Sequence, residues 1–249
     1  GKLPWKELGV NIVLECTGIF RTAAKVQPHI DAGAEKVLIS APGKDDSFQS
    51  IVIGVNDDKL DRSRKLFSNA SCTTNCLAPL CKLVEQSWGF EQGTMTTVHA
   101  ITADQNLQDA PHSDLRRARA ASVNIVPTST GAASAVGKVY PAVAGKMFAM
   151  AVRVPVITGS LVELNVIVEK DVTPEEVNQR FREASENEMK GILQYTEDPI
   201  VSSDIVRNPH SAIFDAGLTD VKGKILKIVA WYDNEAGYSA RLAQLTSLL

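Results

Sequence analysis

The stretch Ser68-Asn69-Ala70-Ser71-Cys72-Thr73-Thr74-Asn75-Cys76-Leu77-Ala78-Pro79-Leu80 is the part of the sequence from which the fold can be worked out. It follows a short apolar run, Lys65-Leu66-Phe67, which predicts a strand. Gly89 provides a natural end for a helix after it. We therefore predict a strand, a polar turn and a helix that starts close to Cys72. Apolar side chains recur with the spacing of one helix face at Leu77, Leu80, Cys81, Val84 and Trp88.

Cys72 is expected in the first turn of that helix, because Ser68, Asn69 and Ser71 are suitable N-cap residues. Free backbone N–H groups and the positive end of the helix dipole stabilise an anion at this place. A thiolate is an anion, so the pattern predicts a lowered thiol pKa and a nucleophilic Cys72. From spacing alone, a small cysteine buried at a helix start is an equally good interpretation.

The composition predicts a folded protein, since 44% of the 249 residues are hydrophobic, which is enough for a core. The formal net charge is only -3, so the chain is neither strongly acidic nor strongly basic. We therefore expect no nucleic-acid partner, and the apolar runs are too short to predict a membrane span. We expect no signal peptide ahead of the first structured residues. The sequence does not begin with Met, which suggests that it starts inside a longer chain.

The four cysteines, Cys16, Cys72, Cys76 and Cys81, lack the spacing of a secreted disulfide framework. Cys72 and Cys76 are one helical turn apart, but no second ligand pair of matching spacing accompanies them. We therefore predict no metal site. We expect a reducing compartment, with the cytoplasm favoured and an organelle left open.

The first part of the chain has the pattern of a parallel strand–helix–strand unit. Residues 11–16 and 36–40 are apolar runs typical of buried strands, and a helix is expected over 22–33. Ligands bind at the carboxyl ends of such strands, where Thr17-Gly18 and Ser40-Ala41-Pro42 lie. Ordinary loop chemistry explains these residues equally well from the sequence alone.

The rest of the chain predicts many strands and one polar segment, 103–119, which is too long for a tight turn. Thr173-Pro174-Glu175-Glu176 is a strong helix start, with a cap, a proline at the first position and acids in the first turn. Parallel strands first and antiparallel strands later indicate two domains that meet near Cys72. Strands are expected at 51–55, 65–67, 95–102, 146–155, 160–169, 213–214, 218–219 and 225–232, and helices from 131, 173 and 236.

A nucleophilic cysteine needs a base, and the chain has four histidines: His29, His99, His112 and His210. His99 lies on an expected strand among apolar and Thr residues, so by itself it is better explained as a satisfied core histidine. His29 is expected at the surface of a helix. His112 and His210 are expected in solvated loops.

Two segments are candidates for binding anions. Thr128-Ser129-Thr130-Gly131 places hydroxyls just ahead of an expected helix start. Arg153 lies in an apolar run, where a charge is costly without a partner, so it binds an anion or forms a buried salt bridge. Arg116, Arg117 and Arg119 are explained as well by a solvated basic patch or by contacts with another subunit.

The segment around Cys72 closely resembles the active-site segment of the phosphorylating glyceraldehyde-3-phosphate dehydrogenases. The strand, Gly-rich turn and helix that begin the family's dinucleotide-binding domain have no counterpart in this sequence. The resemblance therefore implies a member of the family without the N-terminal part of that domain. Four later blocks resemble the family in the same order: Arg119-Ala120-Ala121-Ser122, Pro127-Thr128-Ser129-Thr130-Gly131-Ala132-Ala133, Ala151-Val152-Arg153-Val154-Pro155 and Trp231-Tyr232-Asp233-Asn234-Glu235.

The resemblance implies an α/β plus α+β fold, in which the remainder of a Rossmann-type parallel nucleotide-binding domain precedes a catalytic domain with a mixed or antiparallel sheet. We expect these domains at 1–71 and 72–233, with a C-terminal helix at 234–249 that packs back on the first. The implied activity is the oxidative phosphorylation of glyceraldehyde 3-phosphate to 1,3-bisphosphoglycerate. It would pass through a Cys72 hemithioacetal and thioester, transfer a hydride to NAD(P), and take place in a homotetramer.

The resemblance also assigns roles to individual residues. Cys72 would be the nucleophile and His99 the base, while Thr102 and Arg153 would hold the substrate phosphate. The attacking inorganic phosphate would be held by Ser71, Thr73, Arg117, Thr130 and Gly131. The nicotinamide nucleotide would be bordered by Thr17, Gly18, Asn234 and Tyr238.

Two positions depart from the commoner family pattern. Ala110 is smaller than the residue that many NAD-dependent members carry near the neighbouring subunit's nucleotide, so NADP stays open beside NAD. Ala236 stands where a large apolar residue is more usual, which would loosen local packing. Three other functions stay open: an erythrose-4-phosphate dehydrogenase, an inactive or scaffold fragment, and a cysteine hydrolase. For a hydrolase the sequence shows no third group that would orient the base.

Overall fold

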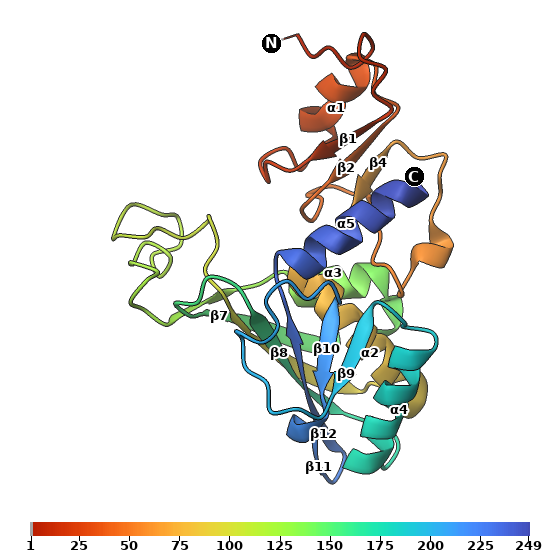
Figure 1. The fold of residues 1–249 in the computed structure, drawn as a ribbon, viewed down its shortest axis with the longest axis vertical. Coiled ribbons are helices and arrows are strands. Elements are labelled where there is room, and N and C mark those ends of the chain that lie inside the picture. The colour runs from red at the N-terminus through yellow and green to blue at the C-terminus, as the bar shows by residue number, and fades with distance from the viewer. Residues whose placement is uncertain (1) are drawn as a thin grey trace.

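The computed structural model describes residues 2–249, which form two sheets (Figure 1). The smaller sheet has four strands in the order β1-β2-β4-β3, and the larger has the order β6-β7-β5-β8-β12-β10-β9, with β11 paired to β12. The predicted fold class, a parallel sheet followed by a mixed sheet, is confirmed. Within residues 2–249, none of the helices is both long and apolar enough to cross a membrane.

The smaller sheet is parallel throughout. Its strands and the helix between the first two are β1 (Ile12–Glu15), β2 (Lys36–Ile39), β3 (Gln49–Ser50), β4 (Leu66–Ser68) and α1 (Ala23–Asp31). Val26 of α1 is fully buried and belongs to one apolar cluster with Val13 and Val37 of the strands. The carboxyl end of β4 leads directly into the turn before Cys72.

The strand predicted at 51–55 is absent, because the backbone turns there. The Asn56 side chain accepts a hydrogen bond from the Val52 N–H at 2.8 Å, and the Asp57 carboxylate accepts one from the Gly54 N–H at 2.7 Å. Gly54 has φ 85, a left-handed conformation that suits glycine. Side-chain acceptors thus replace a partner strand. The apolar run 51–55 is largely buried, as its composition indicates, but its backbone is not an extended strand.

The larger sheet is mixed, since β5–β7 and β9–β10 are parallel pairs and the other pairs are antiparallel. Because β5 and β7 run parallel, their carboxyl ends meet, and His99 is in register with Arg153. The strand predicted at 218–219 is instead a 3₁₀ turn, Ala216–Leu218. The strands are β5 (Gln92–His99), β6 (Val126–Ser129), β7 (Met147–Arg153), β8 (Ser160–Ile167), β9 (Leu193–Thr196), β10 (Ala212–Asp215), β11 (Asp220–Lys222) and β12 (Ile225–Tyr232).

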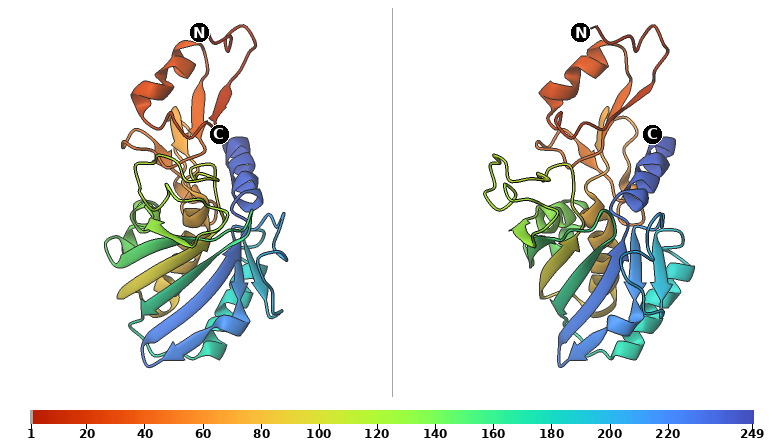
Figure 2. Two further views of the ribbon diagram at one scale, coloured as in Figure 1. Left: turned by 90° about the vertical axis from the view of Figure 1, so that its left-hand side faces the viewer. Right: turned by 60° about the vertical axis from the view of Figure 1, so that its left-hand side comes forward.

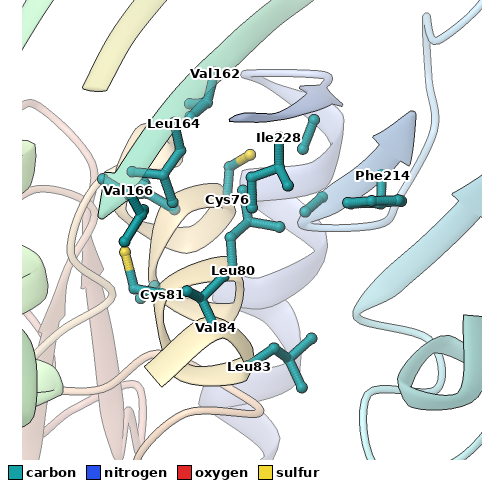
Figure 3. Close-up of a cluster of buried hydrophobic side chains, with 14 of the residues drawn as sticks. Cys76, Leu80, Cys81, Leu83, Val84, Val162, Leu164, Val166, Phe214 and Ile228 are labelled. Atoms are coloured by element: carbon teal, nitrogen blue, oxygen red, sulfur yellow. The ribbon is translucent and has the colours of Figure 1, made fainter. Parts of the chain in front are cut away.

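Three helices, α2 (Cys72–Trp88), α3 (Ala132–Val139) and α4 (Pro174–Glu186), contact the larger sheet. In the left view of Figure 2 the strands of the larger sheet lie in front of these helices. The apolar face of α2, including Leu80 and Val84, meets Leu164 of β8 and Ile228 of β12 in the core shown in Figure 3. Helix α4 begins with the predicted cap, a capping box between Thr173 and Glu176.

The last helix, α5 (Ala236–Leu248), returns to the smaller sheet, as Figure 1 shows. Leu245 is fully buried in a cluster with Leu38 and Phe67 of that sheet. At the other end of the helix, the Tyr238 hydroxyl donates to the Ala70 carbonyl at 3.1 Å. Helix α5 therefore connects the smaller sheet to the turn before Cys72.

Candidate active site

A cavity of about 390 Å³ lies where the start of α2 meets the carboxyl ends of β5 and β7. A larger hollow, about 570 Å³, lies at the opposite end of the same sheet, but its lining includes no cysteine or histidine. Chemistry therefore selects the smaller cavity. The predicted site residues that line it are Ser71, Cys72, Thr73, His99, Thr102, Arg117, Thr130, Gly131, Arg153 and Asn234. Three others do not line it: Thr17, Gly18 and Tyr238.

Cys72 is the first residue of α2, as the sequence predicts, and Ser71 is the N-cap. The Ser71 hydroxyl accepts a hydrogen bond from the Thr74 N–H at 3.1 Å. Ala70 has φ 55, a left-handed conformation that is costly for alanine. This turn directs the chain from β4 into the helix and leaves the Cys72 side chain at the cavity.

His99, at the end of β5, lies beside this thiol. Its Nε2 is 3.5 Å from Cys72 Sγ, and the side chain is only 3% exposed. Burial first, and the positive charge of Arg153 second, together lower the pKa of His99 to about 4. The imidazole is therefore neutral near pH 7, with one nitrogen able to accept a proton.

The thiol pKa corrects the sequence prediction. Burial raises the pKa of Cys72 above its ordinary value, although the Thr73 hydroxyl, the Arg153 charge and nearby backbone N–H groups oppose this. The helix start stabilises the thiolate, but the loss of solvation outweighs it. The pair is therefore a neutral thiol facing a neutral imidazole. Such a pair can react when the base takes the proton as sulfur attacks.

Arg153, at the end of β7, contacts the other side of the His99 ring. Its Nη1 donates to the Ala100 carbonyl at 3.0 Å and lies 2.6 Å from His99 Nδ1. No carboxylate within residues 2–249 forms an ion pair with it, and its Nε is buried without a partner. The buried salt bridge considered from the sequence is therefore not found in the described chain. A half-buried guanidinium facing the cavity is suited to an anionic ligand.

Arg117 enters the cavity from the segment between β5 and β6, which Figure 1 shows extending away from the sheets. Its guanidinium pairs with Asp104 and lies 3.7 Å from the Asp114 carboxylate. It also donates to the Thr128 hydroxyl at 3.0 Å. Hydrogen bonds, first from Thr128, hold the pKa of Asp114 below its usual value. Two carboxylates thus compensate the charge of Arg117, and no local sequence pattern predicts either pairing.

The other three histidines are more buried than the sequence predicts. His29 is 13% exposed, because Trp5 Nε1 donates to its Nδ1 at 3.1 Å and the Glu15 carboxylate lies 3.3 Å from its Nε2. His112 and His210 are half-buried. None of these three lines the cavity.

Two sets of the predicted residues bear on a nucleotide site, one in the cavity and one outside its lining. Asn234 lines the cavity, and its side-chain oxygen accepts hydrogen bonds from the Gly159 N–H and the Ser160 hydroxyl at 3.2 and 2.9 Å. These bonds fix the amide and leave its NH₂ group as the available donor. Thr17 and Gly18 form the turn after β1, where both Thr17 N–H and hydroxyl donate to the Glu15 carboxylate.

Sequence reasoning missed Arg21 and Glu235, which also line the cavity. Arg21 follows the Thr17-Gly18 turn and donates through Nε to the Pro42 carbonyl at 2.9 Å. Pro42 follows the carboxyl end of β2, where the sequence predicts a ligand-binding edge. Adjacency to that turn was the available signal for Arg21.

Comparison with known proteins places the whole chain in one group. Residues 71–234 match the family model described as "Glyceraldehyde 3-phosphate dehydrogenase, C-terminal domain". The chain is 57% identical to a glyceraldehyde-3-phosphate dehydrogenase of Mycobacterium avium over 99% of its own length and 73% of the relative's. It is 54% identical to glyceraldehyde-3-phosphate dehydrogenase 2 of Streptomyces arenae, over 100% of this chain and 75% of that protein.

Proposed function

The chain belongs to the glyceraldehyde-3-phosphate dehydrogenase family, and from this premise we propose that it oxidises and phosphorylates glyceraldehyde 3-phosphate with Cys72 as nucleophile. The observation that carries the proposal is the Cys72 Sγ–His99 Nε2 distance of 3.5 Å in a cavity that also holds Arg153. A nucleophile, a neutral base and an uncompensated cation within one cavity fit a phosphorylated aldehyde.

In the proposed first step, Sγ of Cys72 attacks the aldehyde carbon while the thiol proton moves to Nε2 of His99. The low pKa of His99, about 4, makes the resulting imidazolium a strong acid. It returns the proton to the new oxygen, which gives a neutral hemithioacetal. The Cys72 N–H at the helix start is a second donor toward this oxygen.

A nicotinamide nucleotide would be held by Asn234 and Tyr238 and by the Thr17-Gly18 turn, and would supply the hydride acceptor for oxidation of the hemithioacetal to a thioester. His99 takes the hydroxyl proton in that step, which is general-base work. The free NH₂ group of Asn234 fits a carboxamide oxygen. NAD is the proposed cofactor, and NADP is the alternative.

Inorganic phosphate then attacks the Cys72 thioester and releases 1,3-bisphosphoglycerate. We propose that it is held beside the start of α3, where the cavity presents hydroxyl and backbone donors. Thr102 and Arg153 are proposed to hold the ester phosphate of the substrate, away from the attacking one. The residues proposed for the attacking phosphate are Ser71, Thr73, Arg117, Thr130 and Gly131.

We further propose that residues 1–71 and 72–233 act as nucleotide-binding and catalytic domains, that 234–249 joins them, and that the protein works as a homotetramer. The two sheets and the return of α5 to the smaller one support this division. Sedimentation of the purified chain measures the assembly. A monomer at micromolar concentration would contradict the tetramer.

Steady-state rates with two aldehydes and two nucleotides test the activity. We expect kcat/KM to be highest with glyceraldehyde 3-phosphate and NAD, and to require phosphate or arsenate. A higher kcat/KM for erythrose 4-phosphate would replace the proposed substrate. Calorimetric titration with NAD, followed by a rate measurement, separates an active chain from a scaffold. Binding without turnover would mean that the fold has lost its activity.

A further inference from the structure

Two polar atoms, the Ala100 carbonyl oxygen and Arg153 Nη1, both lie within hydrogen-bond distance of Nδ1 of the buried His99 ring. Nδ1 lies 2.7 Å from the Ala100 carbonyl oxygen and 2.6 Å from Arg153 Nη1, and that Nη1 is 3.0 Å from the same oxygen. All three separations are hydrogen-bond distances. On the other side of the ring, Nε2 faces Cys72 Sγ.

These three contacts cannot all be hydrogen bonds at once. A guanidinium only donates, so a bond from Arg153 to Nδ1 requires Nδ1 without a proton. A carbonyl only accepts, so a bond between Nδ1 and Ala100 requires Nδ1 with a proton. A neutral imidazole has one N–H, so the first arrangement puts the proton on Nε2 and the second leaves Nε2 free. Only the second lets Nε2 take a proton from Cys72.

Arg153 is placed to decide between the two. Within residues 2–249 it has no carboxylate partner, and its buried Nε has no partner either. Without an anion, Nη1 has only neutral acceptors, Nδ1 and the Ala100 oxygen. An anion in the cavity would attract the guanidinium more strongly than a neutral nitrogen does, because charge-assisted hydrogen bonds are shorter and stronger.

We propose that Arg153 holds His99 in the tautomer with the proton on Nε2, and that a phosphate ester bound at Arg153 releases the ring into the tautomer with a free Nε2. The ring loses one proton from Nε2 and gains one at Nδ1 by exchange with solvent, so its charge does not change. Ala100 then accepts the Nδ1–H. The phosphate group of a substrate would thereby switch on the base. This deepens the proposed function, since it makes Arg153 a positioning residue for His99 as well as an anion ligand.

The first test reads the tautomer itself and needs no turnover. Imidazole ¹⁵N spectra of the histidine-labelled chain distinguish a protonated ring nitrogen from an unprotonated one. We expect the free chain at pH 7.5 to show His99 with Nε2–H, and glycerol 3-phosphate to convert it to Nδ1–H. Glycerol is the matched control ligand and should change nothing. A free chain with Nδ1–H, or an unchanged tautomer at saturating glycerol 3-phosphate, overturns the proposal.

Arg153→Leu removes the donor, so its His99 should show Nδ1–H without any ligand and no response to glycerol 3-phosphate. Nε2–H in this variant would also overturn the proposal, because the tautomer would then not depend on Arg153. Arg117→Leu is the comparison, since Arg117 lines the same cavity but has no hydrogen bond to His99. It should keep the Nε2–H tautomer of the free chain.

The second test uses the substrate in two pieces. Phosphite, a dianion without the sugar, should raise kcat/KM of the wild-type chain for unphosphorylated glyceraldehyde by about tenfold or more. Arg153→Leu should show no such activation. If the chain has no dehydrogenase activity, the proposed function fails, while the ¹⁵N result still decides the tautomer switch. Activation by phosphite in Arg153→Leu would show that the dianion acts elsewhere.

Discussion

The candidate site has two sides that handle charge differently. One side is formed by the adjacent ends of β5 and β7, which carry His99 and Arg153 in register and include no carboxylate partner for the arginine. The other is formed by the segment between β5 and β6, where Arg117 pairs with Asp104, whose side chain is 55% exposed, and lies close to Asp114. The same residue type is thus uncompensated on the sheet and compensated on the loop.

The difference lies in the partners, because both arginines are partly buried but only Arg117 has a solvent-exposed aspartate, Asp104, beside it. An ion pair with an exposed carboxylate contributes only about 0–1 kcal/mol, so Asp104 competes weakly with a phosphate for Arg117. On the sheet side, burial makes an uncompensated charge costly, and a bound anion relieves that cost. We therefore expect substitutions on the sheet side to have the larger effects on the reaction.

The largest effect should come from His99→Asn. Loss of the proton acceptor at 3.5 Å from Cys72 should slow acylation by about 10²–10⁴-fold, the usual contribution of a general base. A pre-steady-state burst with glyceraldehyde 3-phosphate measures it. The matched control is His210→Asn, a histidine that does not line the cavity. Equal rates in the wild type and His99→Asn, with an unchanged circular dichroism spectrum, would remove His99 from the mechanism.

Arg153→Leu should have the next largest effect, and it should depend on the substrate. Loss of a charge-assisted contact to the ester phosphate should cost about 2–4 kcal/mol of transition-state stabilisation, roughly 30- to 1,000-fold in kcat/KM. Unphosphorylated glyceraldehyde has no phosphate to lose, so its kcat/KM should not fall. Equal losses for both aldehydes, with a lower Tm, would make Arg153 a structural residue.

Much of the sheet side could be predicted from the sequence. The helix start at Cys72 and a strand that includes His99 were predicted from local signals, although the strand was expected at 95–102 and ends at His99. The pairing of His99 with Arg153 depends on β5 and β7 lying side by side in parallel, which links residues far apart in the chain. No local pattern encodes that pairing, so only the family resemblance put the two residues in one site.

Two errors have the same physical origin. The lowered pKa predicted for Cys72 considered the helix start but not the burial that raises it. The strand predicted at 51–55 considered the apolar composition but not the Asn56 and Asp57 side chains that turn the backbone. Burial and side-chain capping depend on the surroundings of a residue. On the loop side, the pairing of Asp104 with Arg117 is a tertiary contact of the same kind.

The raised thiol pKa predicts how alkylation depends on pH. Well below its pKa, the thiolate fraction of Cys72 grows about tenfold per pH unit, so the iodoacetamide rate should rise steeply from pH 7 to 9 without a plateau near neutrality. Peptide mapping at one equivalent should find the label on Cys72. Cys76 is the internal control, because it is fully buried and its thiol pKa is raised well above the ordinary value. A plateau below pH 7 would restore the low pKa that the sequence predicts.

The smallest effect should come from Asp104→Asn, on the loop side. Removing this carboxylate should free part of the Arg117 charge for the attacking phosphate, so KM for inorganic phosphate should fall. Because the Asp104 side chain is 55% exposed, the change should be about two- to fivefold, the range that a surface ion pair allows. KM for the aldehyde and the Tm should hardly change. Asp109→Asn is the control, since Asp109 pairs with the exposed Arg119 in the same segment and does not line the cavity. If KM for phosphate rises instead, Asp104 positions Arg117 for the anion, and the loop side would resemble the sheet side in depending on one fixed arginine.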